Sequence, residues 1–370
     1  MRVLHVVATG QRRGAELFAS DLIHALGEDG ISQHVVVLRE TGGVAVAYQA
    51  PIAVLRPKGG VIRSFPMDPG RIRALRAFVG KWEPSVIHAH GGEAFLYSVL
   101  GGRGAPIVYK RISLALPHVR RGLYRATYSA LIRRAARVVA VADVVRREMI
   151  TTFRIPPDRV VTIPNGRDAR RLQGARARED VRRELGIAPE APAILSLGAL
   201  SWEKDPLVQV DAAARVLADV PDAVHLVAGD GPMREEVEGA VRSHALDGRA
   251  LVLGSRADAA DLLSASDVML MASRTEGMPG SLIEAGMAGL PVVAYAVGGV
   301  SEVVEHGVTG LLVPPGDIEA LTDALLQLVK DGAARRAMGR AAQQRCRSNF
   351  DIRVVAPRYV QLYREVARAN

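Results

Sequence analysis

The chain has 370 residues, of which 49% are hydrophobic and 4% aromatic, and its 48 Lys and Arg against 39 Asp and Glu give a formal charge of +9. This length exceeds one ordinary hydrophobic core and favours two domains of roughly 150 to 200 residues. The single cysteine, Cys346, excludes an internal disulfide and a cysteine-based zinc site.

Neither a signal peptide nor a membrane-spanning helix is expected. The apolar start from Val3 to Ala8 is short and runs into glycine and arginine residues, unlike a signal peptide. A spanning helix needs about 20 apolar residues, whereas the most apolar stretch, 285–300, is interrupted by four glycines and a proline. We therefore expect a soluble, cytoplasmic protein.

The positive charge is concentrated in the first half of the chain. Residues 1–165 include 24 basic and 11 acidic residues, whereas the remainder includes 24 and 28. Most of the excess lies in Arg103–Arg159, with 13 basic and 3 acidic residues. This stretch is either a core-packed helix with a solvated arginine face or a surface that docks on an anionic membrane. In the first case Tyr124 and Tyr128 belong to the packed stripe.

The first half alternates strands and helices. An apolar strand, Arg2–Ala8, leads through a glycine-containing loop to a helix over Ala15–Leu26, whose apolar residues recur at helical spacing. Further strands, separated by helical stretches, are predicted at Gln33–Leu38, Ser85–His88, Pro106–Tyr109 and Val138–Val141. Their Val- and Ile-rich runs are typical of parallel strands buried on both faces.

The second half repeats this alternation. Strands are predicted at Ala193–Leu197, Val224–Ala228, Ala250–Leu253, Val268–Met271, Pro291–Ala294 and Leu311–Val313. Helices are predicted between them near Leu207–Leu217, Arg234–Ala245, Ala259–Ala265 and Leu282–Ala288. The alternation indicates an α/β protein of two Rossmann-like doubly wound domains, whose parallel sheets face a central cleft.

Domain boundaries follow from a loss of apolar periodicity. It disappears after Ile163-Pro164-Asn165-Gly166, in an arginine-rich stretch that extends to about Asp180. We predict an N-terminal domain over 1–165, a linker over 166–190 and a second domain over 191–348. Three helices end the chain, at Ile318–Val329, Ala333–Arg347 and Ile352–Ala367. The last, within 349–370, follows a completed domain and could cross back to the first.

The segment from Ser273 to Ala285 carries the strongest functional signal. Its loop, between a predicted strand and a predicted helix, contains Gly277, Pro279 and Gly280. The backbone N–H groups of Met278, Gly280 and Ser281 would point at a ligand in front of the helix. Together with the helix dipole, such groups favour an anion such as a diphosphate.

Two carboxylates, Glu276 and Glu284, flank this turn with seven residues between them. A carboxylate on each side of a bound diphosphate can accept hydrogen bonds from ligand hydroxyls. Equally, Glu276 can favour the helix N-terminus electrostatically while Glu284 is an ordinary surface residue of the helix. Spacing alone leaves both interpretations open.

These segments resemble family 4 retaining glycosyltransferases, which share an E-x7-E signature and the GT-B architecture of two Rossmann-like domains. In the second half the match is nearly continuous and includes Gly229-Asp230-Gly231-Pro232, Leu253-Gly254-Ser255-Arg256, Ala265-Ser266-Asp267-Val268, Val297–Val304 and Gly307–Val313. In the first half it is looser and rests on Gly14-Ala15-Glu16, His88-Ala89-His90 and Pro164-Asn165-Gly166.

The resemblance implies transfer of a sugar from a nucleotide-diphosphate sugar, of UDP or GDP type, to an acceptor hydroxyl with retention at the anomeric carbon. It places the donor mainly in the second domain and the acceptor mainly in the first, and it implies no metal or other cofactor. The acceptor stays open between a lipid-linked or cell-envelope glycan and a small natural product.

By position, Glu284 resembles the family residue that binds the ribose hydroxyls, Glu276 the one that holds the transferred sugar, and Lys204 the phosphate-binding lysine. Because the leaving diphosphate develops negative charge, a fixed cation there stabilises the transition state. The turn from Gly277 to Ser281 would cradle the distal phosphate. The remaining donor-site candidates of the second half are Gly198, Gly229, Gly231 and, near the base, Arg256.

One cation of the family pattern is missing. Members often carry an arginine where this chain has Ala199. Candidate replacements are Arg274, Arg12 and Arg13, unless Lys204 and the helix dipole carry the charge alone.

The first half supplies weaker candidates. After the strand Pro106–Tyr109 family members often present a histidine, where this chain has Ile112 next to Arg111. Arg111 either faces the donor phosphate or an acidic acceptor, or is structural. His90 ends a strand and is either an acceptor-binding group or base, or core packing. Gly14 belongs to a loop that lets a ligand approach the backbone.

Three alternative functions compete with this one. A nucleotide-sugar epimerase or a phosphorylase uses the same scaffold, and the run of second-half motifs argues against both. An inactive partner protein would not need the Glu276, Glu284 and Lys204 set. A nucleic-acid-binding protein is suggested only by the isoelectric point of about 10.0, since aromatic residues are few and no nucleic-acid module is found.

Overall fold

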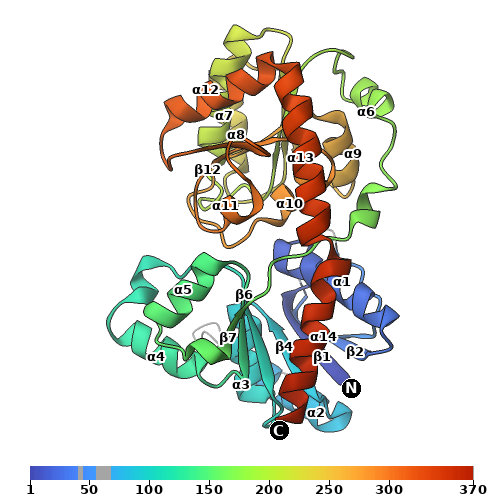
Figure 1. Ribbon diagram of the computed structural model, residues 1–370, viewed down its shortest axis with the longest axis vertical. Coiled ribbons are helices and arrows are strands. Elements are labelled where there is room, and N and C mark those ends of the chain that lie inside the picture. The colour runs from blue at the N-terminus through green and yellow to red at the C-terminus, as the bar shows by residue number, and fades with distance from the viewer. Residues whose placement is uncertain (41–44, 56–67, 370) are drawn as a thin grey trace. The chain divides into compact units, whose positions relative to one another are not determined.

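The computed structural model describes residues 1–40, 45–55 and 68–369. The chain divides into two compact units, one formed by Met1–Gly166 with Ile352–Asn370 and the other by Arg167–Asp351. Each unit contains one parallel sheet with helices packed around it (Figure 1). The prediction of an α/β protein with two Rossmann-like domains is confirmed.

The sheet of the first unit has the strand order β3-β2-β1-β4-β5-β6-β7, with every pair parallel. Its strands are β1 Arg2–Thr9, β2 Ser32–Arg39, β3 Ile52–Val54, β4 Val86–His90, β5 Ile107–Arg111, β6 Arg137–Ala140 and β7 Val160–Thr162. The strands β3 and β7 are not predicted from the sequence, because both are short edge strands without the buried apolar run that marks the central strands.

The helices of the first unit connect these strands. They are α1 Gly14–Glu28, α2 Pro69–Trp82, α3 Gly92–Gly101, α4 Gly122–Ile132 and α5 Asp143–Thr151. Local side chains set the N-terminal boundary of α2. The Asp68 side chain accepts hydrogen bonds from the N–H groups of Gly70 and Arg71, and Pro69 suits the first turn because it has no N–H to leave unpaired.

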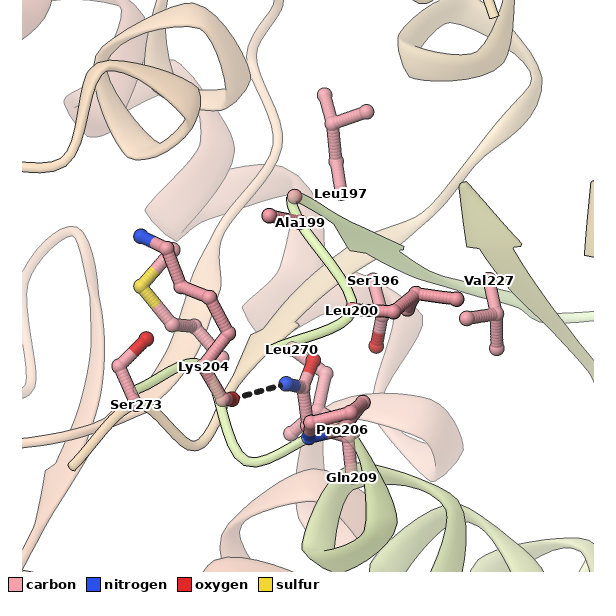
Figure 2. A pocket seen from close by; sticks show the side chains of 12 residues that line it. Ser196, Leu197, Ala199, Leu200, Lys204, Pro206, Gln209, Val227, Leu270 and Ser273 are labelled. Atoms are coloured by element: carbon pink, nitrogen blue, oxygen red, sulfur yellow. Dashed lines mark hydrogen bonds between the residues drawn. The ribbon is translucent and has the colours of Figure 1, made fainter. Parts of the chain in front are cut away.

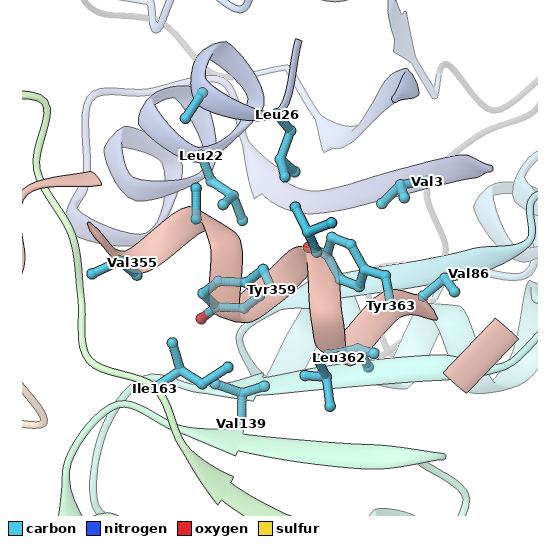
Figure 3. Close-up of a cluster of buried hydrophobic side chains, with 14 of the residues drawn as sticks. Val3, Leu22, Leu26, Val86, Val139, Ile163, Val355, Tyr359, Leu362 and Tyr363 are labelled. Carbon is cyan, nitrogen blue, oxygen red and sulfur yellow. The ribbon is translucent and has the colours of Figure 1, made fainter. Parts of the chain in front are cut away.

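The last helix, α14 Ile352–Arg368, belongs to the first unit and packs against α1 and β4. Its buried residues recur at three-to-four spacing and include Ile352, Val355, Tyr359 and Tyr363. They join a core with residues of α1 and of the sheet, among them Leu22 and Val86 (Figure 3). The chain end is therefore an integral part of the first domain's core.

The sheet of the second unit has the order β10-β9-β8-β11-β12-β13 and is also parallel. Its strands are β8 Ala193–Leu197, β9 Val224–Ala228, β10 Ala250–Gly254, β11 Val268–Met271, β12 Val292–Tyr295 and β13 Gly310–Val313. Its helices are α6 Arg178–Glu184, α7 Pro206–Asp219, α8 Arg234–Ser243, α9 Ala259–Ala265, α10 Gly280–Met287, α11 Val300–Val303, α12 Ile318–Lys330 and α13 Gly332–Phe350.

The stretch 166–190, predicted as a linker, is largely packed structure. A 3-10 turn at Ala169–Leu172 and α6 both contact α9, and Arg176 donates to the Asp261 carboxylate of that helix at 2.7 Å. Its apolar pattern is weak because arginine ion pairs, rather than apolar burial, hold much of it.

Within the described ranges, no helix combines the length and the apolar content that crossing a membrane requires.

Candidate functional site

The candidate site lies at the carboxyl end of β11, where a loop leads into α10. The helix begins at Gly280, two residues before the predicted start, with Pro279 at the N-cap in an extended conformation. Proline has no hydrogen-bonding side chain, so the N-cap residue itself does not cap this end. The first N–H groups of α10 have no partner within the helix and favour an anion.

Lys204 and Glu276 meet beside this turn although 72 positions separate them in the sequence. The Lys204 Nζ lies 2.5 Å from Glu276 Oε1, and the Glu276 side chain is 8% exposed against 29% for Lys204. The pair brings together the cation and one of the two carboxylates that the sequence selects. A phosphate ligand would compete with Glu276 for the lysine ammonium.

The loop before α7 holds Lys204 through several contacts. The Gln209 side chain donates to the main-chain oxygen of Lys204 at 2.7 Å (Figure 2). Asp205 has a left-handed backbone with φ of 47° and pairs with Arg274 at 2.7 Å. The Arg274 guanidinium also lies over the Trp202 ring, 5.2 Å from its centroid. Arg274, a candidate replacement for the missing arginine, thus braces the Lys204 loop.

A pocket opens beside Lys204 at the ends of β8, β9 and β11 (Figure 2). At Gly198 an added Cβ would meet no atom within 4 Å, so this backbone can be approached closely. The Ser273 side chain is 1% exposed, and its Oγ has no hydrogen-bond partner among the described residues. A buried hydroxyl without a partner is costly, and a polar ligand in the pocket would satisfy it.

Gly229 and Gly231 have a structural reason to be glycine. Gly229 has a φ of +152°, and a Cβ there would lie 1.7 Å from the main-chain oxygen of Gly198. A Cβ on Gly231 would lie 2.3 Å from that of Leu200. Both residues therefore allow the loop after β9 to pack closely on the loop after β8, which contains the pocket residues Gly198 and Leu200.

Arg256 forms an ion pair with Asp258, with Nε 2.8 Å from Oδ1 and Nη2 2.5 Å from Oδ2. The hydrogen bonds from Arg256 hold the pKa of Asp258 below its usual range. Arg256 also lies 3.6 Å from Glu184 of α6. The structure thus places this residue in an ion-pair network that fastens α6 to the start of α9.

Glu284, the second carboxylate of the signature, lies 2.7 Å from the Nε of Arg167. Sequence reasoning missed Arg167, which stands 117 positions away in the predicted linker. One indirect signal exists, since Gly280 leaves room beside the helix for a large neighbouring side chain.

In the first unit, His90 belongs to a buried series of side chains, Gln33, His5 and His90, that are hydrogen-bonded to one another. Gln33 donates through Nε2 to the Ile23 oxygen at 2.8 Å, so its Oε1 accepts from His5 Nε2 at 3.1 Å. His5 Nδ1 then accepts from His90 Nε2 at 3.1 Å. This assignment, inferred from the network, leaves a lone pair on His90 Nδ1. Burial, followed by the neighbouring His5 and Lys110, lowers the pKa of His90, so it is a weak base.

No motif in the sequence predicts that three histidines gather here. Ring nitrogens of His5, His88 and His90 lie within 4.8 Å of one another, the one such group of possible metal ligands found in the described ranges. Burial, then the neighbouring histidines and the Lys110 ammonium lower the pKa of His88. A metal cation would meet the same repulsion from Lys110, which is fully buried over the Phe18 ring.

The buried histidines predict a loss of stability in mild acid. Burial lowers the pKa of His5 and His225 to about 4, and that of His88 and His90 well below 6.5. Because unfolded histidine has a pKa near 6.5, the unfolded chain binds protons first as the pH falls. The contribution of these buried neutral histidines to the free energy of unfolding is complete above pH 7. It decreases from about pH 6.5 towards pH 4, by up to about 1.4 kcal/mol per histidine and pH unit.

Urea unfolding between pH 7.5 and 5.5 measures this effect. The pH dependence of the free energy of unfolding should become shallower in His225→Gln, because the replaced ring is buried. A free energy of unfolding that is flat across this range would contradict the assignment.

Arg111, also in the first unit, is held in a buried polar cluster. It donates to the Tyr128 hydroxyl at 2.7 Å and lies 3.9 Å from a carboxylate oxygen of Glu148. These contacts fit the structural alternative for Arg111. Gly14 begins α1 and is exposed. The expectation that Tyr124 joins a packed stripe is wrong, because its side chain is 68% exposed.

Comparison with known proteins supplies family relations for both units. The model of glycosyl transferases group 1 matches residues 177–345, and the model of glycosyltransferase family 4 matches residues 12–171. The chain is 32% identical over 284 residues to the 2-deoxystreptamine N-acetyl-D-glucosaminyltransferase of Streptomyces fradiae, covering 70% of this chain and 66% of that protein.

Two other relatives differ in how much of them is matched. The chain is 26% identical to the UDP-Gal:alpha-D-GlcNAc-diphosphoundecaprenol alpha-1,3-galactosyltransferase of Escherichia coli over 70% of each chain. The chain is 32% identical to the N-acetyl-alpha-D-glucosaminyl L-malate synthase of Bacillus anthracis, and the match covers 51% of this chain and about half, 49%, of that protein.

Solved structures agree on the fold. Anabaena HepE in complex with UDP and glucose superposes with a TM-score of 0.84 at 22% identity, covering 97% of this chain and 98% of that chain. Sucrose-phosphate synthase from Thermosynechococcus elongatus superposes with a TM-score of 0.83 at 22% identity, covering 100% of both chains.

Proposed function

This chain belongs to the glycosyl transferases group 1, within glycosyltransferase family 4, and we propose that it moves a sugar from a nucleotide-diphosphate sugar to an acceptor hydroxyl with retention. The observation that carries this proposal is the pairing of Lys204 Nζ with Glu276 at 2.5 Å, beside the N-terminus of α10. A cation and aligned N–H groups at one turn suit a diphosphate.

In the proposed reaction the bond between the anomeric carbon and the diphosphate oxygen breaks as the acceptor oxygen bonds to the same face of that carbon. The acceptor proton passes to the departing phosphate oxygen, so no external base is required. Lys204 and the N–H groups of α10 neutralise the charge that develops on the leaving group. Because these groups supply that charge, we propose a reaction without a metal ion.

The two carboxylates have separate proposed roles. Glu276, next to Lys204, holds hydroxyls of the transferred sugar, and Glu284, one turn inside α10, accepts hydrogen bonds from the ribose hydroxyls. Ser273 Oγ, which is buried without a partner among the described residues, offers a further contact in the pocket. The donor is of UDP or GDP type, and the UDP-galactose named for the Escherichia coli relative favours testing UDP first.

Calorimetry with UDP, GDP, ADP and their glucose conjugates tests this proposal. We expect one nucleotide to bind in the micromolar range and Glu284→Ala to weaken it about tenfold or more, since hydrogen bonds to a charged group are lost. Glu319→Ala, which removes an exposed carboxylate from α12, is the control. Failure of all six compounds to bind would remove the proposal, and turnover of nucleotide sugar without acceptor would indicate an epimerase or phosphorylase.

For the acceptor side we propose docking on an anionic membrane through an exposed patch of the first unit. Leu116, Leu123 and Tyr124 are 47%, 78% and 68% exposed, and the exposed Arg120 and Arg121 lie between them in the chain. Apolar side chains mixed with arginines suit the interface of an anionic bilayer. A lipid-linked acceptor would be presented there.

Vesicle co-sedimentation measures this docking. Binding should need phosphatidylglycerol, weaken at high salt, and fall several-fold in the double variant Leu123→Ser, Tyr124→Ser, but not in Leu100→Ser on α3. Equal binding to vesicles of neutral phosphatidylcholine, or none to either kind, would argue against the membrane.

A further inference from the structure

The Arg167 side chain reaches the first turn of α10. It is only 3% exposed, and its Nε lies 2.7 Å from Oε1 of Glu284, whose side chain is 19% exposed. A Cβ on Gly280 would lie 1.8 Å from the Arg167 Nη2 and 2.4 Å from its Cζ. Since Gly280 and Glu284 are four positions apart, they share one helix face, and the guanidinium lies along that face.

The position of Arg167 is fixed from its backbone as well. Its N–H donates to the Phe350 oxygen at the end of α13 at 2.9 Å, and a parallel bridge pairs it with Asp351. Helix α13 in turn packs closely on α10, because a Cβ on Gly286 would lie 2.4 Å from the Cys346 Sγ. The arginine and the helix that it touches are therefore both fastened to α13.

Charge explains why this arrangement needs both partners. A cation beside a helix N-terminus is disfavoured by the helix dipole, and a buried guanidinium without a counter-ion is costly. Glu284 supplies the compensating charge from the same helix. In return the guanidinium restricts the carboxylate, because a hydrogen bond to one oxygen sets where the other lone pairs point.

We propose that Arg167 is a positioning residue of the donor site, which holds the Glu284 carboxylate in the orientation that accepts hydrogen bonds from the ribose hydroxyls. Gly280 is glycine because the Arg167 guanidinium occupies the space of its side chain. This inference rests on the proposed function, in which Glu284 binds ribose.

Ribose recognition gives a direct test. Calorimetry would compare the nucleoside diphosphate that binds wild-type protein with its 2′,3′-dideoxy analogue, which lacks both ribose hydroxyls. The wild type should prefer the ribonucleotide about tenfold or more, and Glu284→Ala should lose this preference. Arg167→Ala should lose most of it with little change in dideoxynucleotide affinity, and Arg167→Lys should retain part.

The Gly280 side of the inference has its own variant. Gly280→Ala should displace the guanidinium, so it should lower both the ribonucleotide preference and the melting temperature. In the Arg167→Ala background the space is empty, and Gly280→Ala should then cause no further loss in either quantity. Arg178→Ala, which removes the ion pair with Asp267 at 2.9 Å, is the matched control and should keep the wild-type preference.

The outcomes separate the inference from the function beneath it. No nucleotide binding by the wild type would overturn both together. A wild type that prefers ribose through Glu284, together with an undiminished preference in Arg167→Ala, would overturn the inference alone. A Gly280→Ala penalty that persists in the double variant would do the same. A melting curve and the dideoxynucleotide affinity of each variant report folding independently of ribose recognition.

Discussion

Replacing Lys204 by alanine is expected to lower the turnover number by about 10² to 10³-fold, the range found when one fixed group that stabilises developing negative charge is removed. Its ammonium lies beside Glu276 at the anion-favouring end of α10. Because position 199 is alanine, no arginine there supplies a second positive charge to the diphosphate. The initial rate of nucleoside diphosphate release from the selected nucleotide sugar measures the effect.

The matched control for this variant is Lys330→Ala in the same unit. Lys330 lies 3.8 Å from Asp219, and both side chains are more than half exposed, so its loss should leave the rate unchanged. Wild-type turnover in Lys204→Ala would show that the lysine is not part of the reaction site.

Gly298→Ala is expected to damage both the site and the fold. Gly298 has a φ of +53°, and a Cβ there would lie 1.8 Å from the main-chain oxygen of Glu276. The left-handed backbone alone costs about 1–3 kcal/mol with a side chain. Because the contact must in addition displace Glu276 and with it the partner of Lys204, turnover should fall about 100-fold, as happens when a reacting group moves by about 1 Å.

Gly307→Ala separates these two effects. Gly307 has a similar backbone, with a φ of +77°, but a Cβ there would meet nothing within 4 Å. It should show the backbone cost in urea unfolding without the loss of turnover. Equal turnover in the two variants would mean that Glu276 is not held by its contact with Gly298.

The elements that the sequence predicted best are those in which burial and periodicity coincide. Helix α14 was expected at Ile352–Ala367 and is found at Ile352–Arg368, because its apolar stripe faces a core. The sequence does not predict the two shortest strands, β3 and β7. It also does not predict that the stretch 166–190 is packed. The two strands lie at the edges of the sheet and are only partly buried, and arginine ion pairs hold much of the stretch 166–190, so neither shows the hydrophobic pattern from which elements are predicted.

In the candidate site, too, some features follow from local sequence and others depend on contacts between distant segments. Glu276, Glu284 and the glycine turn lie within one strand–loop–helix unit, so their proximity follows from local chain geometry. The partners of the two carboxylates come from elsewhere, with Lys204 72 positions and Arg167 117 positions away. Of these, only Lys204 matched a motif. The cluster of His5 with His88 and His90 likewise joins two strands that are neighbours in the sheet but distant in the sequence.

The sequence by itself determined two parallel α/β domains, the strand-to-helix turn at which an anion is favoured, and the carboxylates that flank it, because all of these depend on residues close together in the chain. The tertiary structure decided which charges meet. The packing of α13 on α10 brings Arg167 to Glu284. The order of strands in the first sheet buries His90 beside His5, and the fold of the first unit leaves Leu123 and Tyr124 exposed. A charge or an apolar side chain acquires its role from its surroundings, and these are set by contacts between distant segments.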